Sequence, residues 1–293
     1  MAQVAGGGDE RAAAPRVGFV GAGQLGEPMV ERLLTAGIPV LLYARRPEVA
    51  DRLARLGAVP VPSLPELGAQ ADVVISCLFN DAQLTEVALG GPSGDGLLAA
   101  MAPGSVLASH TTGTLATVAR LADAAAARDV QVVEAPISGT AADIRAGKLT
   151  VLLAGAPAAL DAVEPVLRAG YADPVLRTGA LGSALKVKLI NNVLFAAHSQ
   201  LAADAIRLAG ELDVDPAQLI AALSHCSGES RAAGYVLDVG GAAAFAAAVL
   251  PFLRKDVAAC EQVAAELGAD LGFMGRTVQQ GPLDLIGAAT TAS

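Results

Sequence analysis

The chain has 293 residues, of which 53% are hydrophobic and only 3% aromatic, and its formal net charge is -9 at pH 7. That charge repels a phosphate backbone and the scarce aromatics leave few platforms for stacked bases, so we expect no nucleic-acid partner. The length is about twice that of a typical domain, which favours a nucleotide-binding unit followed by a second unit.

Residues 1–15 lack the basic and then apolar regions of a secretory signal, and we predict a disordered tail there. Cys77, Cys226 and Cys260 are odd in number and widely spaced, which indicates reduced thiols in a cytoplasmic protein and no metal site. The most apolar later stretch, 236–253, contains Asp, Gly and Pro, which is typical of a buried helix and not of a membrane span.

From residue 16 to about 179, short β-branched runs alternate with Ala- and Leu-rich helical stretches, the pattern of βαβ units around a parallel sheet. The candidate strands are 17–20, 40–43, 73–77, 106–109, 130–135 and 150–154. Each is short and separated from the next by Gly, Pro, Asp or Asn.

Beyond residue 182 the strand signals stop, and apolar residues recur at helical spacing over 185–212, which predicts one long helix. The remainder is helix-like, with breaks near 240–241 and near 213–216, where Asp215 would cap a helix that begins at Pro216. We therefore predict an α/β Rossmann N-terminal domain over 16–180 and an all-α C-terminal substrate and dimerisation domain over 181–293, joined by a long interdomain helix.

A glycine-rich turn follows the first predicted strand. Gly21, Gly23 and Gly26 form a G-x-G-x-x-G pattern ahead of a helical run. Such glycines permit a tight turn, a close backbone approach to a pyrophosphate and close packing of helix on strand, while the helix N-terminus offers amide donors. We predict that a dinucleotide binds here, on Gly21, Ala22, Gly23, Gln24, Leu25 and Gly26.

The second predicted strand selects the cofactor. NAD-binding proteins usually end this strand in an acidic residue that holds the ribose hydroxyls, but here it ends in Arg45 and Arg46. Two guanidinium groups favour the 2′-phosphate of NADP, which Arg can bind through charge-assisted hydrogen bonds. NADP is the expected cofactor, with NAD possible; the alternative is that both arginines are solvated turn residues ahead of Pro47.

Three segments together resemble one family. VGFVGAGQLGEPMVERL at 17–33, EAPISGT at 134–140 and GSALKVKLINN at 182–192 are similar, in this order, to motifs of the 3-hydroxyisobutyrate dehydrogenase or β-hydroxyacid dehydrogenase family, which is 6-phosphogluconate dehydrogenase-like. The resemblance implies an NAD(P)-dependent dehydrogenase that moves hydride between nicotinamide and a small 3-hydroxy acid or its aldehyde or keto form.

The third segment carries the expected catalytic pair. Lys188 and Asn192 are separated by four residues, so on a helix they share a face, whereas Lys186 should point elsewhere. The resemblance assigns Lys188 the role of general acid/base on the substrate oxygen and gives Asn192 an orienting role. A lysine can act in this way if its surroundings lower its pKa.

The resemblance also implies that Ser138, Gly139 and Thr140 bind the acid group of the substrate, with Ser138 in the catalytic set. Thr140 stands where the family usually has glycine, and the alternative for the segment is a plain polar turn. Further cofactor contacts are expected by resemblance at Leu78, Phe79, Thr112 and Lys255, although Phe79 replaces the proline usual at that position.

His110, His198 and His225 have no second His or Cys at ligand spacing, so they are predicted to be structural, and no metal is expected. The polar segment 224–230 is either an interhelical loop or an element that approaches the active site of a partner subunit. A small-molecule substrate and a homodimer or higher homo-oligomer are the expected partners.

Two other functions stay open. Imine reductases share the expected architecture but generally lack the catalytic lysine, so Lys188 favours chemistry at oxygen. A non-catalytic NADP-binding protein would have no need of the Lys188 and Asn192 pair. Turnover of small hydroxy or aldehyde acids and of imines would separate the three.

Overall fold

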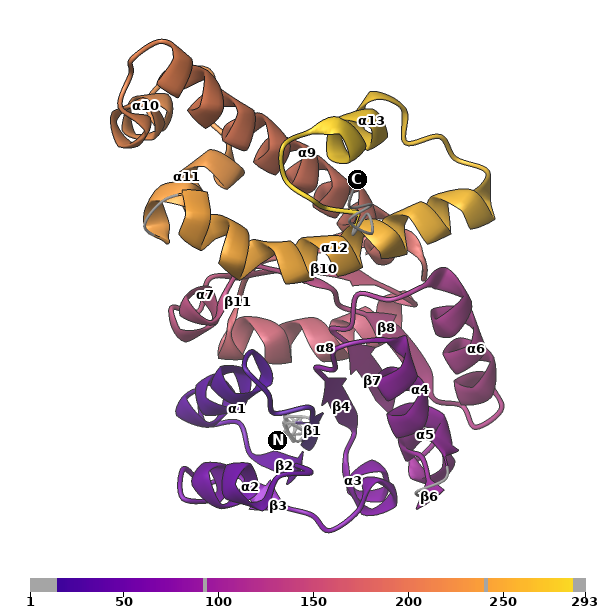
Figure 1. Ribbon diagram of the computed structural model, residues 1–293. Helices are drawn as coiled ribbons and strands as arrows, with labels where there is room; N and C mark the ends of the chain where they lie inside the picture. Colours follow the sequence, from indigo (N-terminus) through magenta and orange to yellow (C-terminus); the bar gives the residue numbers. More distant parts are fainter. Residues whose placement is uncertain (1–14, 92–93, 240–241, 287–293) are drawn as a thin grey trace, which may run out of the picture.

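The computed structural model of the chain describes residues 15–91, 94–239 and 242–286. The predicted N-terminal tail and the predicted break at 240–241 therefore lie outside the described residues, apart from residue 15. The chain builds a strand-rich lobe and a helical lobe, and Figure 1 shows the two stacked on each other.

The first lobe is organised around one mainly parallel sheet, with strands in the order β11-β10-β8-β7-β4-β1-β2-β3 and a short strand β9 paired with β10. The strands are β1 (Val17–Val20), β2 (Val40–Tyr43), β3 (Val59–Pro60), β4 (Val73–Ser76), β7 (Val106–Ser109), β8 (Gln131–Glu134), β9 (Ile137–Ser138), β10 (Leu149–Ala154) and β11 (Ala172–Gly179). A separate hairpin is formed by β5 (Gly90–Gly91) and β6 (Gly94–Asp95). The chain turns back from β3 to β4, so the sheet order reverses between β1 and β4, where ligands of such folds bind.

Helices cover both faces of this sheet. They are α1 (Gly26–Thr35), α2 (Pro47–Ala54), α3 (Leu64–Gln70), α4 (Asp81–Leu89), α5 (Leu97–Ala100), α6 (Leu115–Ala126), α7 (Ala141–Arg145) and α8 (Pro157–Gly170). Phe19 packs in the same core as Met29 and Leu33 of α1, while its neighbour Val20 belongs to a second core with Leu84 of α4. Alternate residues of β1 thus serve opposite faces, as the pleat of a strand requires.

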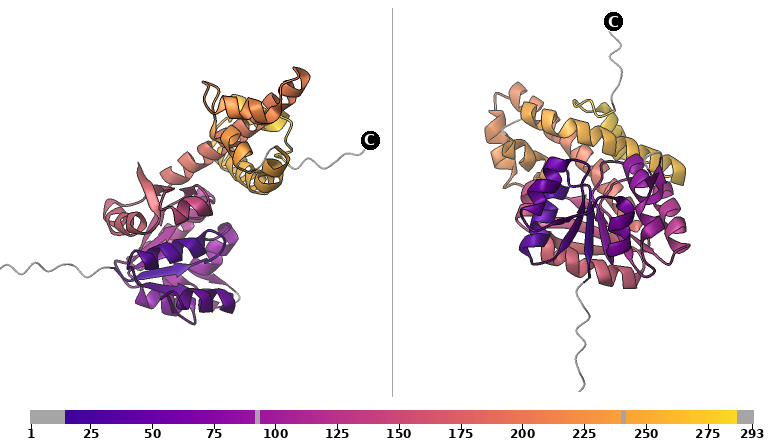
Figure 2. Two further views of the ribbon diagram at one scale, coloured as in Figure 1. Left: turned by 90° about the vertical axis from the view of Figure 1, so that its left-hand side faces the viewer. Right: turned by 90° about the horizontal axis from the view of Figure 1, so that it is seen from below.

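The second lobe is all helical. Its helices are α9 (Ser183–Glu211), α10 (Pro216–Leu223), α11 (Arg231–Asp238), α12 (Ala242–Leu267) and α13 (Gly272–Gln280). Figure 2 shows α9 running from the strand-rich lobe into the helical lobe, where α11, α12 and α13 pack against it. Gln200 of α9 is buried and its amide nitrogen donates to the carbonyls of Val278 and Leu283, which fastens the C-terminal part of the chain to α9.

The predicted fold class is confirmed. The candidate strands correspond to β1, β2, β4, β7, β8 and β10, the long helix spans Ser183–Glu211, and Asp215 caps α10 by accepting a hydrogen bond from the Gln218 amide, with Pro216 in the first turn. Within the described ranges, no helix combines the length and the apolar character needed to cross a membrane.

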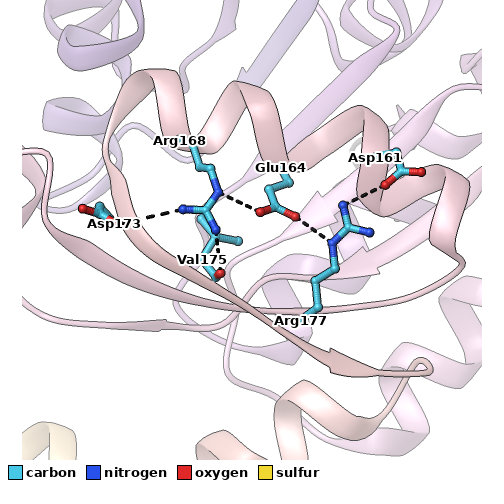
Figure 3. A network of polar contacts seen from close by, with 6 residues as sticks. All are labelled: Asp161, Glu164, Arg168, Asp173, Val175 and Arg177. Carbon is cyan, nitrogen blue, oxygen red and sulfur yellow. Dashed lines mark hydrogen bonds and ion pairs between the residues drawn. The ribbon is translucent and has the colours of Figure 1, made fainter.

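Strand β11 was not predicted, because it contains Pro174 and several polar residues and alternates poorly. It is an edge strand, where proline is tolerated, and ion pairs tie it to α8. Arg177 of β11 contacts Glu164 and Asp161 of α8, and Arg168 of α8 contacts Glu164 and donates to the Val175 carbonyl, as Figure 3 shows. Side-chain contacts between two neighbouring elements leave no alternation of apolar and polar residues from which a strand could be predicted.

Candidate active site

A cavity of about 820 Å³ opens at the carboxyl ends of the central strands. Its wall includes every residue that the sequence analysis assigned to the cofactor: Gly21, Ala22, Gly23, Gln24, Leu25, Gly26, Arg45, Arg46, Leu78, Phe79, Thr112 and Lys255. Sequence reasoning missed other parts of the wall, among them Gln83, His110, Ile137 and Phe252. These come from separate elements and carry no shared motif, so only the fold brings them together.

The three motif glycines differ in what surrounds them. A Cβ on Gly21, whose φ is +92°, would lie 2.2 Å from the Cys77 carbonyl oxygen, and one on Gly26 would lie 2.1 Å from the Gly21 carbonyl oxygen. A Cβ on Gly23 would meet no protein atom within 4 Å. Gly21 and Gly26 are therefore required by the packing of the turn, whereas Gly23 faces open space in the cavity wall that a ligand can approach.

The N-terminus of α1 begins at this turn. Leu25 is its N-cap and provides no side-chain hydrogen bond, while the Glu27 amide donates to the Gly23 carbonyl at 2.9 Å and Pro28 has no amide hydrogen. The positive end of the helix dipole favours a phosphate group at this turn. The turn is therefore chemically suited to the pyrophosphate of a dinucleotide.

Arg45 and Arg46 follow β2 at one side of the cavity, and both are exposed. Arg46 donates a long hydrogen bond of 3.4 Å to the Ala22 carbonyl. Arg52, by contrast, is held by Glu27 through two hydrogen bonds of 2.5 and 2.6 Å. Arg45 and Arg46 are thus the guanidinium groups of this region that can turn to an anionic ligand.

The helical lobe reaches the cavity where β4 ends. Lys255 of α12 lies with its Nζ 4.9 Å from the centroid of the exposed Phe79 ring and donates to the Phe79 carbonyl at 3.4 Å. Phe252, also on α12, lines the same wall. Residue 79, where the proline expected by resemblance is absent, therefore provides a ring on which a cation from the other lobe rests.

His110 lies at the end of β7 and is buried. Its Nδ1 is 2.6 Å from the Ala135 carbonyl oxygen and its Nε2 is 2.7 Å from the Tyr171 hydroxyl. Burial lowers the pKa of His110 to about 4, so the ring is neutral near pH 7. Since a carbonyl can only accept, Nδ1 carries the proton and Nε2 accepts from Tyr171. These contacts suit the predicted structural role, although the ring also lines the cavity.

Thr111 and the segment 224–230 each have a clear structural role. Thr111, beside the cavity residue Thr112, donates its hydroxyl to the Leu78 carbonyl and so joins the ends of β7 and β4. The segment 224–230 connects α10 to α11, and Ser230 caps α11 by accepting from the Ala233 amide. In the parts of the chain that the structure describes, no three His, Cys, Asp or Glu side chains gather as metal ligands.

The loop predicted to bind the substrate acid group lies beside the cavity, but its own residues are not on the wall. Ser138 follows the wall residue Ile137 in β9, and Gly139 has a φ of +141°. Thr140 is the N-cap of α7, and both its hydroxyl and its amide donate to Asp143 in a capping box. Ser138 and Gly139 are left as the members of the loop whose polar groups can turn to a substrate.

Lys188 and Asn192 also lie off the cavity wall, on the part of α9 that faces α12. Asn192 is buried and donates to the Asp256 carboxylate at 2.9 Å, and its own oxygen accepts from Asn191. Asp256 pairs with the wall residue Lys255, so Asn192 is joined to the cavity through two side chains. The pair thus approaches the cavity from the helical lobe.

The surroundings of Lys188 suit proton exchange. Burial lowers the pKa of Lys188, Asp256 acts in the opposite direction, and Lys255 lowers it further. A lysine with a lowered pKa can give up and regain a proton closer to neutral pH. Lys186, in contrast, is exposed and its charge acts on Glu134, on another side of the helix.

Family models match both lobes. Residues 16–179 match the NAD-binding domain of 6-phosphogluconate dehydrogenase, and residues 182–281 match the NAD-binding domain of NADP-dependent 3-hydroxyisobutyrate dehydrogenase. L-threonate dehydrogenase of Cupriavidus necator is 37% identical over 73% of this chain and 71% of its own length. A crystal structure of 3-hydroxyisobutyrate dehydrogenase from Salmonella typhimurium is similar with a TM-score of 0.77 and 25% identity, covering 90% of this chain and 92% of that one.

The fold and the cavity define a nicotinamide-dependent oxidoreductase with a Rossmann domain and a helical second domain. Within that class, the chain belongs to the β-hydroxyacid dehydrogenase family, the family of the 3-hydroxyisobutyrate dehydrogenases. Its reaction type is NAD(P)-dependent oxidation or reduction at a CH–OH carbon, as the sequence analysis predicted.

Imine reductases are structural neighbours as well. An imine reductase from Pseudomonas sp. has a TM-score of 0.54 and 22% identity to this chain, covering 90% of this chain and 98% of that one. This likeness concerns the fold alone, and the family match favours the hydroxyacid dehydrogenases.

Proposed function

We propose that this enzyme transfers hydride reversibly between NADP(H) and a small hydroxy acid, with Lys188 as the proton-exchanging group. The observation that carries the proposal is the place of Lys188: it is half-buried, burial lowers its pKa, and it lies near the Lys255 and Asp256 pair that reaches the cavity. The substrate would lie between this part of α9 and the loop 138–140.

The wall fits a dinucleotide. Gly23 offers open space at the glycine turn, the N-terminus of α1 suits a pyrophosphate through its dipole, and Arg45 and Arg46 suit a 2′-phosphate. Leu78, Phe79, Thr112 and Lys255 would hold the remainder of the molecule. When bound, NADP supplies the hydride acceptor, and NADPH the hydride donor.

The residues of the chain would exchange the proton and orient the substrate. Loss of hydride from a hydroxyl-bearing carbon requires the hydroxyl proton to leave, and Lys188 in its neutral form would take it; in the reverse direction the ammonium would return it. Asn192, whose amide is fixed by Asp256 and Asn191, would orient the reacting oxygen or the lysine. Ser138 and Gly139 would bind the acid group, and Thr140 would shape the loop as its cap.

Turnover assays test the proposal. The wild-type enzyme is offered L-threonate and 3-hydroxyisobutyrate with NADP or NAD, and a small cyclic imine with NADPH. We expect nicotinamide turnover with at least one hydroxy acid and preference for NADP. Turnover of the imine alone would favour the imine-reductase alternative, and tight NADPH binding without any turnover would favour a non-catalytic NADP-binding protein.

A homo-oligomer is proposed on the basis of α9. Exposed apolar side chains recur along one stripe of this helix, at spacings of three, four and seven residues: Val187, Ile190, Leu194, Leu201 and Leu208. Such a stripe is typical of a helix that packs on another, and a second copy of this chain is the proposed occupant. Light scattering should give a dimer or larger species at micromolar concentration; a monomer mass would overturn the proposal.

Two further assignments stay proposals. We propose that 16–180 is the cofactor unit and 181–293 the substrate and dimerisation unit, because the sheet ends at Gly179 and α9 begins at Ser183. A cytoplasmic location is proposed because Cys77, Cys226 and Cys260 are free thiols.

A further inference from the structure

Glu134 is a buried carboxyl group at the joint between the two lobes. It is the last residue of β8, only 2% exposed, and its Oε2 accepts a hydrogen bond of 2.7 Å from the Gly182 amide. Gly182 is the N-cap of α9 and has a left-handed φ of +94° and no side chain. The carboxylate of a residue far away in the sequence therefore caps the long helix.

The N-terminus of a long helix is a favourable place for this charge. The first amides of a helix lack intrahelical partners, and the helix dipole favours an anion there. The amides of Gly182, Ala184 and Leu185 all favour the charged form of Glu134, but burial outweighs them and raises its pKa to about 7. Its other oxygen, Oε1, is buried without a partner among the described residues.

Glu134 also stands at the start of the proposed substrate loop. The next residue, Ala135, accepts through its carbonyl from His110, and the loop continues through Ser138 to the Thr140 cap. On the other side of the Glu134 contact, α9 continues from Gly182 to Lys188 and Asn192. One hydrogen bond thus joins the chain segment that would bind the acid group to the helix that would exchange the proton.

We propose that Glu134 is a positioning residue for the reaction: by capping α9, it fixes Lys188 and Asn192 relative to the substrate loop 138–140. The inference rests on the proposed function for the identity of Lys188, but the cap itself can be measured without turnover. The amides of α9 favour the charged form, so for an opening of the first turn of α9 in which Glu134 itself stays buried, protonation of Glu134 should loosen the cap as the pH falls through about 7. Global unfolding, which exposes Glu134 to water, has the opposite pH dependence.

Few other groups act on this carboxyl. Lys186 of α9 is the charged side chain whose field favours the ionised form. The strand residues paired with Glu134, Ser109 on β7 and Ala154 on β10, carry no charge. A loss of the cap as the pH falls is therefore attributable to protonation of Glu134 itself. Among the residues that the structure describes, Lys186 is the charged side chain that shifts the pKa of Glu134.

The experiment compares three variants of the full chain. Glu134→Leu removes the acceptor at similar volume, Glu134→Gln keeps an acceptor oxygen without the charge, and Asp215→Ala removes a comparable cap from α10, away from the cavity. Hydrogen-exchange protection is measured for residues 182–188, NADPH affinity by fluorescence, and kcat/KM with L-threonate or whichever hydroxy acid the wild type turns over.

For Glu134→Leu we expect at least tenfold lower protection of residues 182–188 and at least tenfold lower kcat/KM, with NADPH affinity within about twofold of wild type. Asp215→Ala should lose protection only near α10 and keep its activity. Unchanged protection in Glu134→Leu overturns the proposal, and so does lost protection with unchanged kcat/KM, which would make Glu134 a structural cap only.

Glu134→Gln keeps the inference testable if the leucine variant does not bind NADPH. Wild-type protection of residues 182–188 should decrease from pH 8 to pH 6, and in Glu134→Gln this decrease should be absent. A decrease of equal size in both proteins overturns the proposal. If the wild type turns over no substrate at all, the proposed function fails, while the protection measurements still decide whether Glu134 holds α9.

Discussion

The two halves of the proposed active site are built in different ways. On the cofactor side, one glycine turn and the ends of adjacent parallel strands supply the wall of a single cavity. On the substrate side, Ser138, Lys188 and Asn192 come from a loop and a helix of different lobes, lie off the wall, and are joined to it through Asp256, Lys255 and Ile137.

Because the two sides are built differently, we expect cofactor binding and turnover to respond to different substitutions. The glycine turn and the strand ends on the cofactor side are held by the ladder of the parallel sheet, and the helical lobe adds Phe252 and Lys255 to the wall. The substrate side depends on single contacts between lobes, such as that of the Glu134 carboxylate with the Gly182 amide. Substitutions on the substrate side should therefore change turnover with little effect on cofactor affinity, and those on the cofactor side should do the reverse.

The largest effect is expected at Lys188. Lys188→Ala should reduce turnover by on the order of a hundredfold to ten-thousandfold, because removal of a general acid/base has this effect, while NADPH affinity stays nearly unchanged. Asn192→Ala should fall between this variant and wild type, since it loses an orienting hydrogen bond but not the proton donor. Steady-state kinetics and NADPH titration would measure both.

Lys186→Ala is the matched control, because Lys186 is exposed and, two residues from Lys188, points to another side of α9. It should keep most of the activity. If Lys188→Ala is nearly as active as wild type and Lys186→Ala is inactive, the roles of the two lysines are reversed; if both are active, the imine-reductase alternative gains weight.

The next effect concerns stability and pH. Burial raises the pKa of Glu134 from its ordinary value of 4.5 to about 7, so the folded state binds this proton more tightly than the unfolded state. The free energy of unfolding should therefore fall as the pH rises from 4.5 to 7, by roughly 3 kcal/mol from this group, since one pKa unit corresponds to about 1.4 kcal/mol.

Glu134→Gln removes this titration. Urea unfolding at pH 5 and pH 8 should show the variant gaining stability relative to wild type by about that amount at the higher pH. A difference between the two proteins that is constant with pH would mean that Glu134 is charged in the folded state throughout, against the direction of its pKa shift.

A smaller effect, on cofactor affinity, is expected for the two arginines on the cofactor side. Arg45→Ala and Arg46→Ala should each weaken NADPH binding by on the order of tenfold to a hundredfold through loss of charge-assisted hydrogen bonds, with little change for NADH or for turnover at saturating cofactor. Arg55→Ala, an exposed arginine at the other end of α2 that does not line the cavity, is the control. Equal losses for NADPH and NADH would contradict the 2′-phosphate assignment.

The contrast between local patterns and contacts between separate elements also explains what could be predicted from the sequence. The glycine turn, the strand ends and the i, i+4 pair on α9 are local patterns, and the fold class and most strands followed from them. Strand β11, the cavity residue Phe252 and the Glu134 cap depend on contacts between separate elements: β11 pairs with β10 and contacts the preceding helix α8 through ion pairs, and Glu134 contacts Gly182, 48 residues further along the chain. No spacing rule exists for such contacts, although a buried strand that ends in Glu is itself a signal that a partner is required.

The smallest expected effect tests the loop at Thr140, where the family usually has glycine. Its hydroxyl donates to Asp143 and accepts from the Asp143 amide, and its own amide donates to the same carboxylate. Thr140→Ala should therefore lower the free energy of unfolding by about 1 kcal/mol, and Thr140→Gly by only a few tenths, because glycine is tolerated at a helix N-cap. Since the polar groups of Thr140 are already engaged, KM for a hydroxy acid should change less than about threefold in Thr140→Ala. A tenfold rise in KM without loss of stability would show instead that the hydroxyl leaves Asp143 to bind the substrate, and the loop would then select its substrate through a group that the family's usual glycine does not provide.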